Sequence, residues 1–250
     1  MLAIIFVSLY YYYRWKPLWS YEEPRSFYSI SHHHDDTLRI VMIGDSWVGM
    51  RTDTLNNLFQ KRLSSISGRP VILKSKGKGG EKSRGIYQLL FEEKGFGTKP
   101  LLVSGADYCI VLAGINDAAA NLGKEQYVYH MKLIIDFLLA NDTRPVLVEI
   151  PNVNIWTIYG RKPVKDLLGD YIKSIMTGSE MYLFSDYRDA LLSMLKTYND
   201  LVISVPMIEW NGNSRDLNKN LFLSDQIHLN MQGYLKLDSC IINEIQKDLQ

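Results

Sequence analysis

The sequence contains few cysteines and carries almost no net charge. Its 250 residues include only Cys109 and Cys240, and the formal charge at pH 7 is +1. Two cysteines so far apart form neither a disulfide framework nor the spacing of a metal site. No basic stripe is interleaved with aromatic residues, so nucleic acid is not an expected partner. Cys109 lies in an apolar run, which is typical of a small core residue.

The sequence also lacks a typical secretory signal, since no basic residues precede its N-terminal apolar segment. That segment, Leu2 to Tyr13, would span about 18 Å as a helix, short of the roughly 30 Å hydrocarbon core. At and after the end of this segment lie residues typical of a membrane interface: Tyr10–Tyr13, Arg14, Trp15, Lys16 and Trp19. We expect membrane association through residues 2–19, in a membrane-anchored or exported protein. A buried or amphipathic N-terminal arm is the alternative, and the topology is left open.

The composition changes after residue 37. Residues 17–37 contain prolines, serines and the run His32-His33-His34-Asp35-Asp36, which is the composition of a solvated linker. We therefore divide the chain into an N-terminal apolar segment with linker, residues 1–37, and one domain, residues 38–250. No metal site is predicted in either part.

Apolar runs and helical periodicities alternate through residues 38–250. Five runs predict buried strands: 38–43, 71–73, 108–113, 146–150 and 201–205. Between and after them, apolar residues at helical spacing predict helices near 53–63, 86–90, 128–138, 164–175, 191–198 and 233–249. Strands that are apolar throughout and alternate with helices predict an α/β fold, with a parallel sheet of about five strands covered on both faces.

Polar and glycine-rich segments follow the predicted strands, and another precedes the last helix. They are Gly44-Asp45-Ser46, Gly77-Lys78-Gly79-Gly80, Gly114-Ile115-Asn116-Asp117 and Asp225-Gln226-Ile227-His228. Because ligands bind beyond the carboxyl ends of the strands in an open parallel sheet, these segments are expected to converge there. Together they supply a hydroxyl, glycine amides, a side-chain amide and a carboxylate–imidazole pair, which are the groups that acyl transfer requires.

Each of these groups has a chemical role in ester hydrolysis. His228 is the candidate base for the Ser46 hydroxyl, and Asp225 is placed to orient its imidazole. The backbone N–H groups of Ser46 and Gly80 and the side-chain amide of Asn116 are candidate donors to the oxyanion. Asp225 could instead cap the last helix, and Asn116 could only stabilise a turn.

In this order, the four segments resemble the signature blocks of the SGNH/GDSL hydrolases. The resemblance implies a flavodoxin-like three-layer α/β/α sandwich and a serine esterase that needs no cofactor or metal. Two positions depart from the family pattern: Trp47 replaces the usual leucine after the serine, and Gly79 replaces the usual serine before the oxyanion glycine. The oxyanion glycine is therefore Gly80 or Gly79, with Gly80 favoured.

The resemblance leaves the substrate open. We expect O-deacetylation of a carbohydrate or polysaccharide ester, with a lysophospholipase, a thioesterase and an O-acetyltransferase as alternatives that use the same triad. A binding module of the same fold without turnover is the alternative from another class. Four aromatic residues are candidates either for lining the substrate cleft or for packing: Trp47, Trp156, Tyr159 and Trp210.

Overall fold

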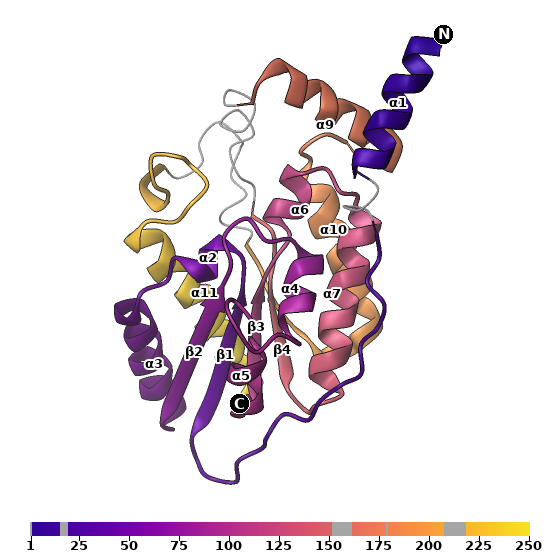
Figure 1. Ribbon diagram of the computed structural model, residues 1–250. Helices are drawn as coiled ribbons and strands as arrows, with labels where there is room; N and C mark the ends of the chain where they lie inside the picture. Colours follow the sequence, from indigo (N-terminus) through magenta and orange to yellow (C-terminus); the bar gives the residue numbers. More distant parts are fainter. Residues whose placement is uncertain (1, 16–19, 152–161, 179, 208–218) are drawn as a thin grey trace.

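The computed structural model describes residues 2–15, 20–151, 162–178, 180–207 and 219–250. Within them, five parallel strands form one sheet in the order β2-β1-β3-β4-β5 (Figure 1). The strands are β1 (Leu38–Gly44), β2 (Val71–Gly77), β3 (Tyr108–Leu112), β4 (Arg144–Val148) and β5 (Ile203–Val205). This sheet confirms the predicted α/β class and parallel pairing.

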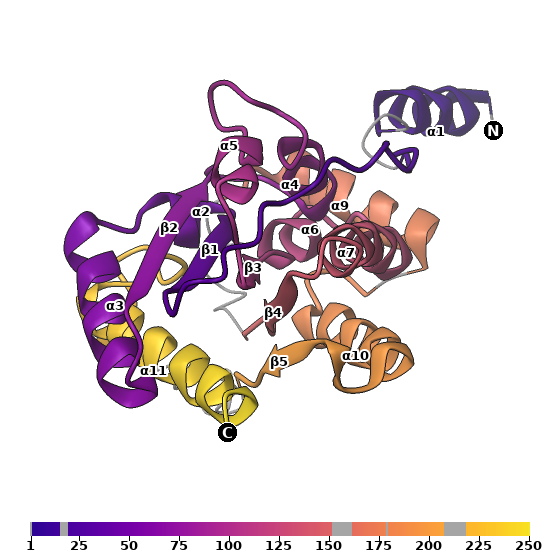
Figure 2. The same cartoon turned by 90° about the horizontal axis from the view of Figure 1, so that it is seen from below.

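Helices cover both faces of the sheet. One face carries α3 (Asp53–Ser67) and α11 (Met231–Asp248), while α4 (Ser83–Leu89) and α7 (Lys124–Leu139) lie on the other, with α10 (Phe184–Leu195) packed against α7 (Figure 2). The other helices among the described residues are α1 (Leu2–Trp15), α2 (Ser46–Gly49), α5 (Lys99–Val103), α6 (Ile115–Ala119), α9 (Val164–Thr177) and the 3-10 turns η2 (Lys196–Leu201) and η4 (Lys219–Leu221). The three layers match the expected α/β/α sandwich.

The core follows from the apolar patterns. Every residue of β3 is buried, and only Arg39 of β1 is not fully buried, because helices cover both faces of these central strands. In α3, Leu55, Phe59 and Leu63 recur every four residues and face the core, and the Thr52 hydroxyl accepts the first-turn N–H of Leu55.

Element ends differ from the sequence prediction where pairing or local turns decide them. β2 extends to Gly77 because it stays in register with all of β1, up to the pair Gly44 and Gly77. β5 starts at Ile203 because η2 occupies the preceding residues. The short helices α2 and α6 carry no apolar period, so periodicity could not predict them.

Residues 20–37 are mostly irregular, but they pack against the domain. Ile30 is buried and its N–H donates to Asn141 Oδ1 at 2.9 Å, while the Glu22 carboxylate pairs with Arg84 at 2.9 Å. The linker composition therefore describes the lack of regular structure and not the contacts of this segment. Among the described residues, no helix combines the length and the apolar character needed to cross a membrane.

Candidate active site

Ser46 lies at the carboxyl end of β1, at the start of α2. Asp45 caps that helix, since its carboxylate accepts the N–H of Trp47 at 3.0 Å. The turn is tight, because a Cβ on Gly44 would come within 2.3 Å of the Leu112 carbonyl oxygen. As the first residue of α2, Ser46 has a backbone N–H without an acceptor inside the helix, which keeps it a candidate oxyanion donor.

His228 approaches Ser46 from the opposite end of the sequence. Its Nε2 is 3.0 Å from Ser46 Oγ, and its Nδ1 is 2.6 Å from Asp225 Oδ2. The loop is closed by the N–H of Leu223, which donates to the His228 carbonyl at 2.7 Å. The cap of α11 is Asn230, whose side chain accepts the Gly233 N–H. Asp225 is therefore not the cap, and its carboxylate is directed to the imidazole.

The environment of Asp225 favours its charged form. Partial burial by itself would raise its pKa, but the His228 ring and the backbone N–H groups of His228 and Ile227, each at 2.9 Å, lower the pKa to about 2. A carboxylate that stays ionised fixes the tautomer of the imidazole with Nε2 free to accept a proton from Ser46.

The candidate oxyanion donors come from two further strand ends. Gly80 has a φ of +72°, the left-handed region that glycine adopts without strain, whereas the φ of Gly79 is not positive. A Cβ on either glycine would meet nothing within 4 Å, so both have room for a substrate. Asn116 Nδ2 donates to the Glu81 carbonyl at 2.9 Å, which ties the amide to the loop that carries these glycines.

Asp45 is a buried carboxyl group that the sequence analysis did not single out. Besides the Trp47 N–H, its carboxylate accepts from Asn116 Nδ2 at 3.3 Å. Burial raises its pKa to about 7; the Trp47 N–H and His228 lower it, while Asp117 nearby raises it. Its position directly before the serine was the available signal, since an aspartate there can cap the following helix.

Asp117 connects α6 to the start of α4, which follows the loop of Gly79 and Gly80. Its buried carboxylate accepts the Ser83 hydroxyl at 2.6 Å and the Ser83 N–H at 3.0 Å, at the start of α4. Burial outweighs these bonds and raises its pKa to about 6. Asp117 therefore serves as a structural link between α6 and α4.

Trp47 is buried and bonded at both ends. Its indole Nε1–H donates to the Ile227 carbonyl at 3.0 Å, and its own carbonyl accepts the Tyr234 hydroxyl at 2.9 Å. These bonds join α2 to the loop of Asp225 and His228 and to α11. Trp47 also lines a small cavity, so it combines a packing role with contact to a hollow.

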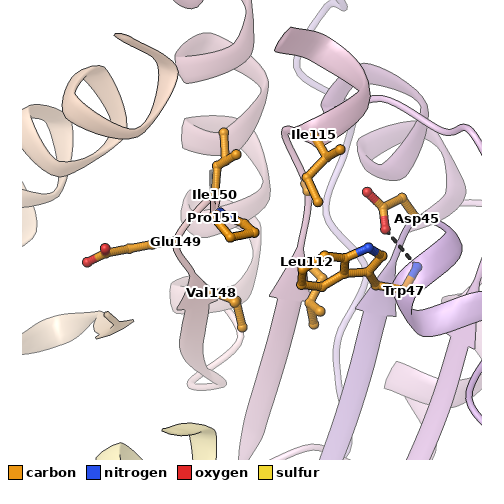
Figure 3. A pocket seen from close by; sticks show the side chains of 9 residues that line it. Asp45, Trp47, Leu112, Ile115, Val148, Glu149, Ile150 and Pro151 are labelled. Atoms are coloured by element: carbon orange, nitrogen blue, oxygen red, sulfur yellow. Dashed lines mark hydrogen bonds between the residues drawn. The ribbon is translucent and has the colours of Figure 1, made fainter. Parts of the chain in front are cut away.

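Two hollows are lined by sequence neighbours of the candidate site residues, although not by Ser46, Asp225 or His228 themselves. The first, about 10 Å³, is lined by both sequence neighbours of Ser46 and by apolar groups: Asp45, Trp47, Leu112, Ala113, Ile115, Val148, Glu149, Ile150 and Pro151. Figure 3 shows the side chain of Glu149 directed away from the Trp47 ring, which leaves Ile115, Ile150 and Pro151 near the hollow. The second, about 340 Å³, is polar and lies beside the oxyanion loop, lined by Glu81, Lys82, Arg84, Gly85, Gln88, Asp117, Leu122, Gln126 and His130.

Three of the candidate cleft aromatics, Trp156, Tyr159 and Trp210, lie outside the described residues. Over the part of the chain that is described, no group of three or more His, Cys, Asp or Glu side chains is arranged to hold a metal ion. In the histidine run, His33 Nε2 lies 3.0 Å from the Ser104 carbonyl.

A parallel α/β/α sandwich with serine, histidine and aspartate at its carboxyl edge is the architecture of a serine hydrolase. The family model of the GDSL-like lipase/acylhydrolases matches residues 42–236. The chain therefore belongs to the GDSL-like lipase/acylhydrolase family and is a serine hydrolase of the GDSL type.

Solved structures share this fold at low sequence identity. A lipase/acylhydrolase from Enterococcus faecalis is 15% identical, with a TM-score of 0.61 and coverage of 85% of this chain and 97% of that one. The psychrotrophic esterase EstA from Pseudoalteromonas, inhibited by monoethylphosphonate, is 15% identical, with a TM-score of 0.59 and coverage of 86% and 99%. A GDSL-like lipase from Bacteroides thetaiotaomicron is 14% identical, with a TM-score of 0.56 and coverage of 96% and 98%. No curated protein sequence matches this chain.

Proposed function

We propose that this protein hydrolyses esters through an acyl-serine intermediate on Ser46. The observation that carries the proposal is the continuous chain of contacts from Ser46 Oγ to His228 Nε2, at 3.0 Å, and from His228 Nδ1 to Asp225, at 2.6 Å. His228 takes the hydroxyl proton as Ser46 attacks the ester carbonyl, and then gives it to the departing alcohol oxygen. Water activated by the same imidazole releases the acid and restores Ser46.

The tetrahedral intermediate places a negative charge on the former carbonyl oxygen. The N–H groups of Ser46 and Gly80 and the Asn116 amide are the donors we assign to it. The Asn116 contact with Glu81, at 2.9 Å, holds one amide hydrogen, while its contact with Asp45 is longer, at 3.3 Å. The weaker contact leaves the second hydrogen available to the oxyanion.

For the substrate we propose a short acyl ester of a carbohydrate, with O-deacetylation of a polysaccharide as the reaction. The small apolar hollow next to Trp47 supports a short acyl group, because its volume suits about one small group such as a methyl. The polar hollow supports a sugar, since it offers amide and charged side chains beside the oxyanion loop.

A lysophospholipase or thioesterase is the second candidate, because apolar side chains of α1 such as Ile4 and Phe6 are 73% and 68% exposed. An exposed apolar helix is typical of proteins that meet lipid. We also propose that residues 2–19 associate with a membrane, in a membrane-anchored or exported protein. An O-acetyltransferase would use the same triad and differ only in passing the acyl group to a sugar hydroxyl.

Labelling with a fluorophosphonate probe tests the nucleophile. We expect the wild-type chain to be labelled and Ser46→Ala to be unlabelled, while Ser65→Ala, a change at an exposed position of α3, keeps labelling. The related Pseudoalteromonas esterase is inhibited by a phosphonate, which is the same class of reagent. A folded wild-type chain that stays unlabelled would support a binding module without turnover and refute the enzyme mechanism.

Turnover on three esters tests the substrate. We expect acetylated xylan and short p-nitrophenyl esters to be hydrolysed faster than lysophosphatidylcholine. A preference for the long acyl chain would reject the carbohydrate proposal while leaving the triad in place.

A further inference from the structure

Helix α9 (Val164–Thr177) packs against the domain with its polar side. The residues that it buries are Gly169, Asp170, Lys173 and Ser174. Asp170 forms ion pairs with Lys162 and Lys173, each at 2.5 Å, and accepts the Tyr182 hydroxyl. Lys173 also donates to the Ala120 carbonyl at 2.8 Å, at the end of α6. This network of charge-assisted bonds holds the helix in place.

The opposite side of α9 is apolar and exposed. Val164, Leu168, Tyr171 and Ile175 follow the spacing of one helical face, and they are 82%, 54%, 56% and 65% exposed. We call these four residues the apolar face of α9. An ordinary surface helix buries such a stripe, as α11 does with Leu237, Ile241 and other apolar residues. Helix α9 instead buries its polar side and exposes its apolar side, which indicates that another apolar surface covers the apolar face of α9.

Helix α1 indicates what kind of apolar surface this is. Four consecutive residues, Ile4, Ile5, Phe6 and Val7, point to different sides of the helix and are 47–73% exposed. A groove on a protein covers one side of a helix, whereas lipid contacts a helix on all sides. Tyr10 and Tyr12 are also exposed, and aromatic residues beside basic ones suit the lipid–water interface.

The two helices lie at the same end of the molecule. Figure 1 places α1 and α9 beyond the carboxyl ends of the strands, the end at which α2 carries Ser46, and Figure 2 shows both on the side of α7. Because α1 has only 14 residues, about 21 Å of helix, it is shorter than the roughly 30 Å hydrocarbon core and would reach only part of the way into a bilayer. A second apolar contact beside it would fix how the domain is oriented.

We propose that the apolar face of α9 and helix α1 form one docking surface for a lipid bilayer, which holds the carboxyl edge of the sheet at the membrane. The α1 contact rests on the membrane association proposed for residues 2–19, whereas the α9 contact is new. Neither depends on ester hydrolysis.

Co-sedimentation of the full-length chain with vesicles of mixed phosphatidylcholine and phosphatidylglycerol tests the proposal. We expect the double variant Leu168→Glu/Ile175→Glu to bind at least about tenfold more weakly, because burying one such side chain is worth more than a tenfold change in affinity. The matched control is Ile66→Glu/Ile72→Glu on α3 and β2, whose isoleucines are 43% and 42% exposed. This control and Ser46→Ala should bind like the wild type. All variants except Ser46→Ala should keep wild-type turnover of a short, water-soluble ester.

Other outcomes would overturn the proposal in distinguishable ways. Binding by the α9 double variant equal to wild type would reject the α9 contact, and loss of binding only on deletion of residues 2–19 would then leave α1 alone. A wild-type chain that does not sediment with vesicles would reject both contacts. If light scattering showed that the wild type is a dimer and the double variant a monomer, the apolar face of α9 would bind a second copy of the chain and not lipid.

Discussion

Two aspartates near the imidazole of His228 occupy opposite environments. Asp225 is in a loop with its side chain 28% exposed, and three donors from two residues lower its pKa to about 2. Asp45 is buried at the start of α2, and burial raises its pKa to about 7. The same side chain is therefore ionised in one place and titrates near neutrality in the other.

The difference shows that donors and access to water, and not residue type, decide which carboxylate is charged. Asp225 is close enough to bond with the ring nitrogen of His228, whereas Asp45 acts on the backbone of α2 and on the Asn116 amide. We therefore propose that Asp225 orients and stabilises the His228 imidazole, and that Asp45 positions α2 and the Asn116 amide.

The largest expected effect comes from removing the charge of Asp225. Asp225→Asn should lower kcat for a short p-nitrophenyl ester by about ten-thousandfold, because a neutral amide supports the wrong imidazole tautomer. Steady-state kinetics measure this change. Asp189→Asn, an exposed position on α10, is the control and should leave kcat unchanged. If Asp45→Asn lowered kcat as much as Asp225→Asn, the separation of roles would be wrong.

A smaller loss of activity is expected when the Asn116 amide, which contacts Asp45 and is a proposed oxyanion donor, is removed. Asn116→Ala removes the amide and should lower kcat by about a hundred- to a thousandfold, with little change in KM, because the donor acts mainly on the transition state. Asn57→Ala on α3, another exposed asparagine, provides the control. A change confined to KM would instead assign Asn116 to ground-state binding.

The smallest effect is on stability and depends on pH. The folded pKa of Asp45 lies above its unfolded value, so its contribution is complete below about pH 4 and is lost as the pH rises through about 7. Between about pH 5 and about pH 8, the unfolding free energy of the wild type should fall by about 3 kcal/mol more than that of Asp45→Asn. Denaturant titrations at both pH values measure this. Equal slopes for the two proteins would show that Asp45 is ionised in the fold throughout this range.

Much of the fold was predictable because its signals are local. The continuous apolar run at 38–43 predicts a strand buried on both faces, and β1 occupies Leu38–Gly44. The period in 128–138 predicts a helix, and α7 contains it from Lys124 to Leu139. The helix predicted over 164–175 also forms, as α9, but its period did not show that the apolar side faces outward. Which side is buried depends on bonds to other segments, such as those from Lys173 to the Ala120 carbonyl and from the Tyr182 hydroxyl to Asp170.

The α/β class and the candidate residues Ser46, Asp225 and His228 follow from apolar runs and short motifs, which involve neighbouring residues only. The protonation of Asp45, the bond from the Trp47 indole to the loop of His228 and the outward apolar face of α9 follow from the packing of the whole chain. Each of these depends on burial or on contacts between segments far apart in the chain. Patterns among neighbouring residues therefore cannot predict these properties.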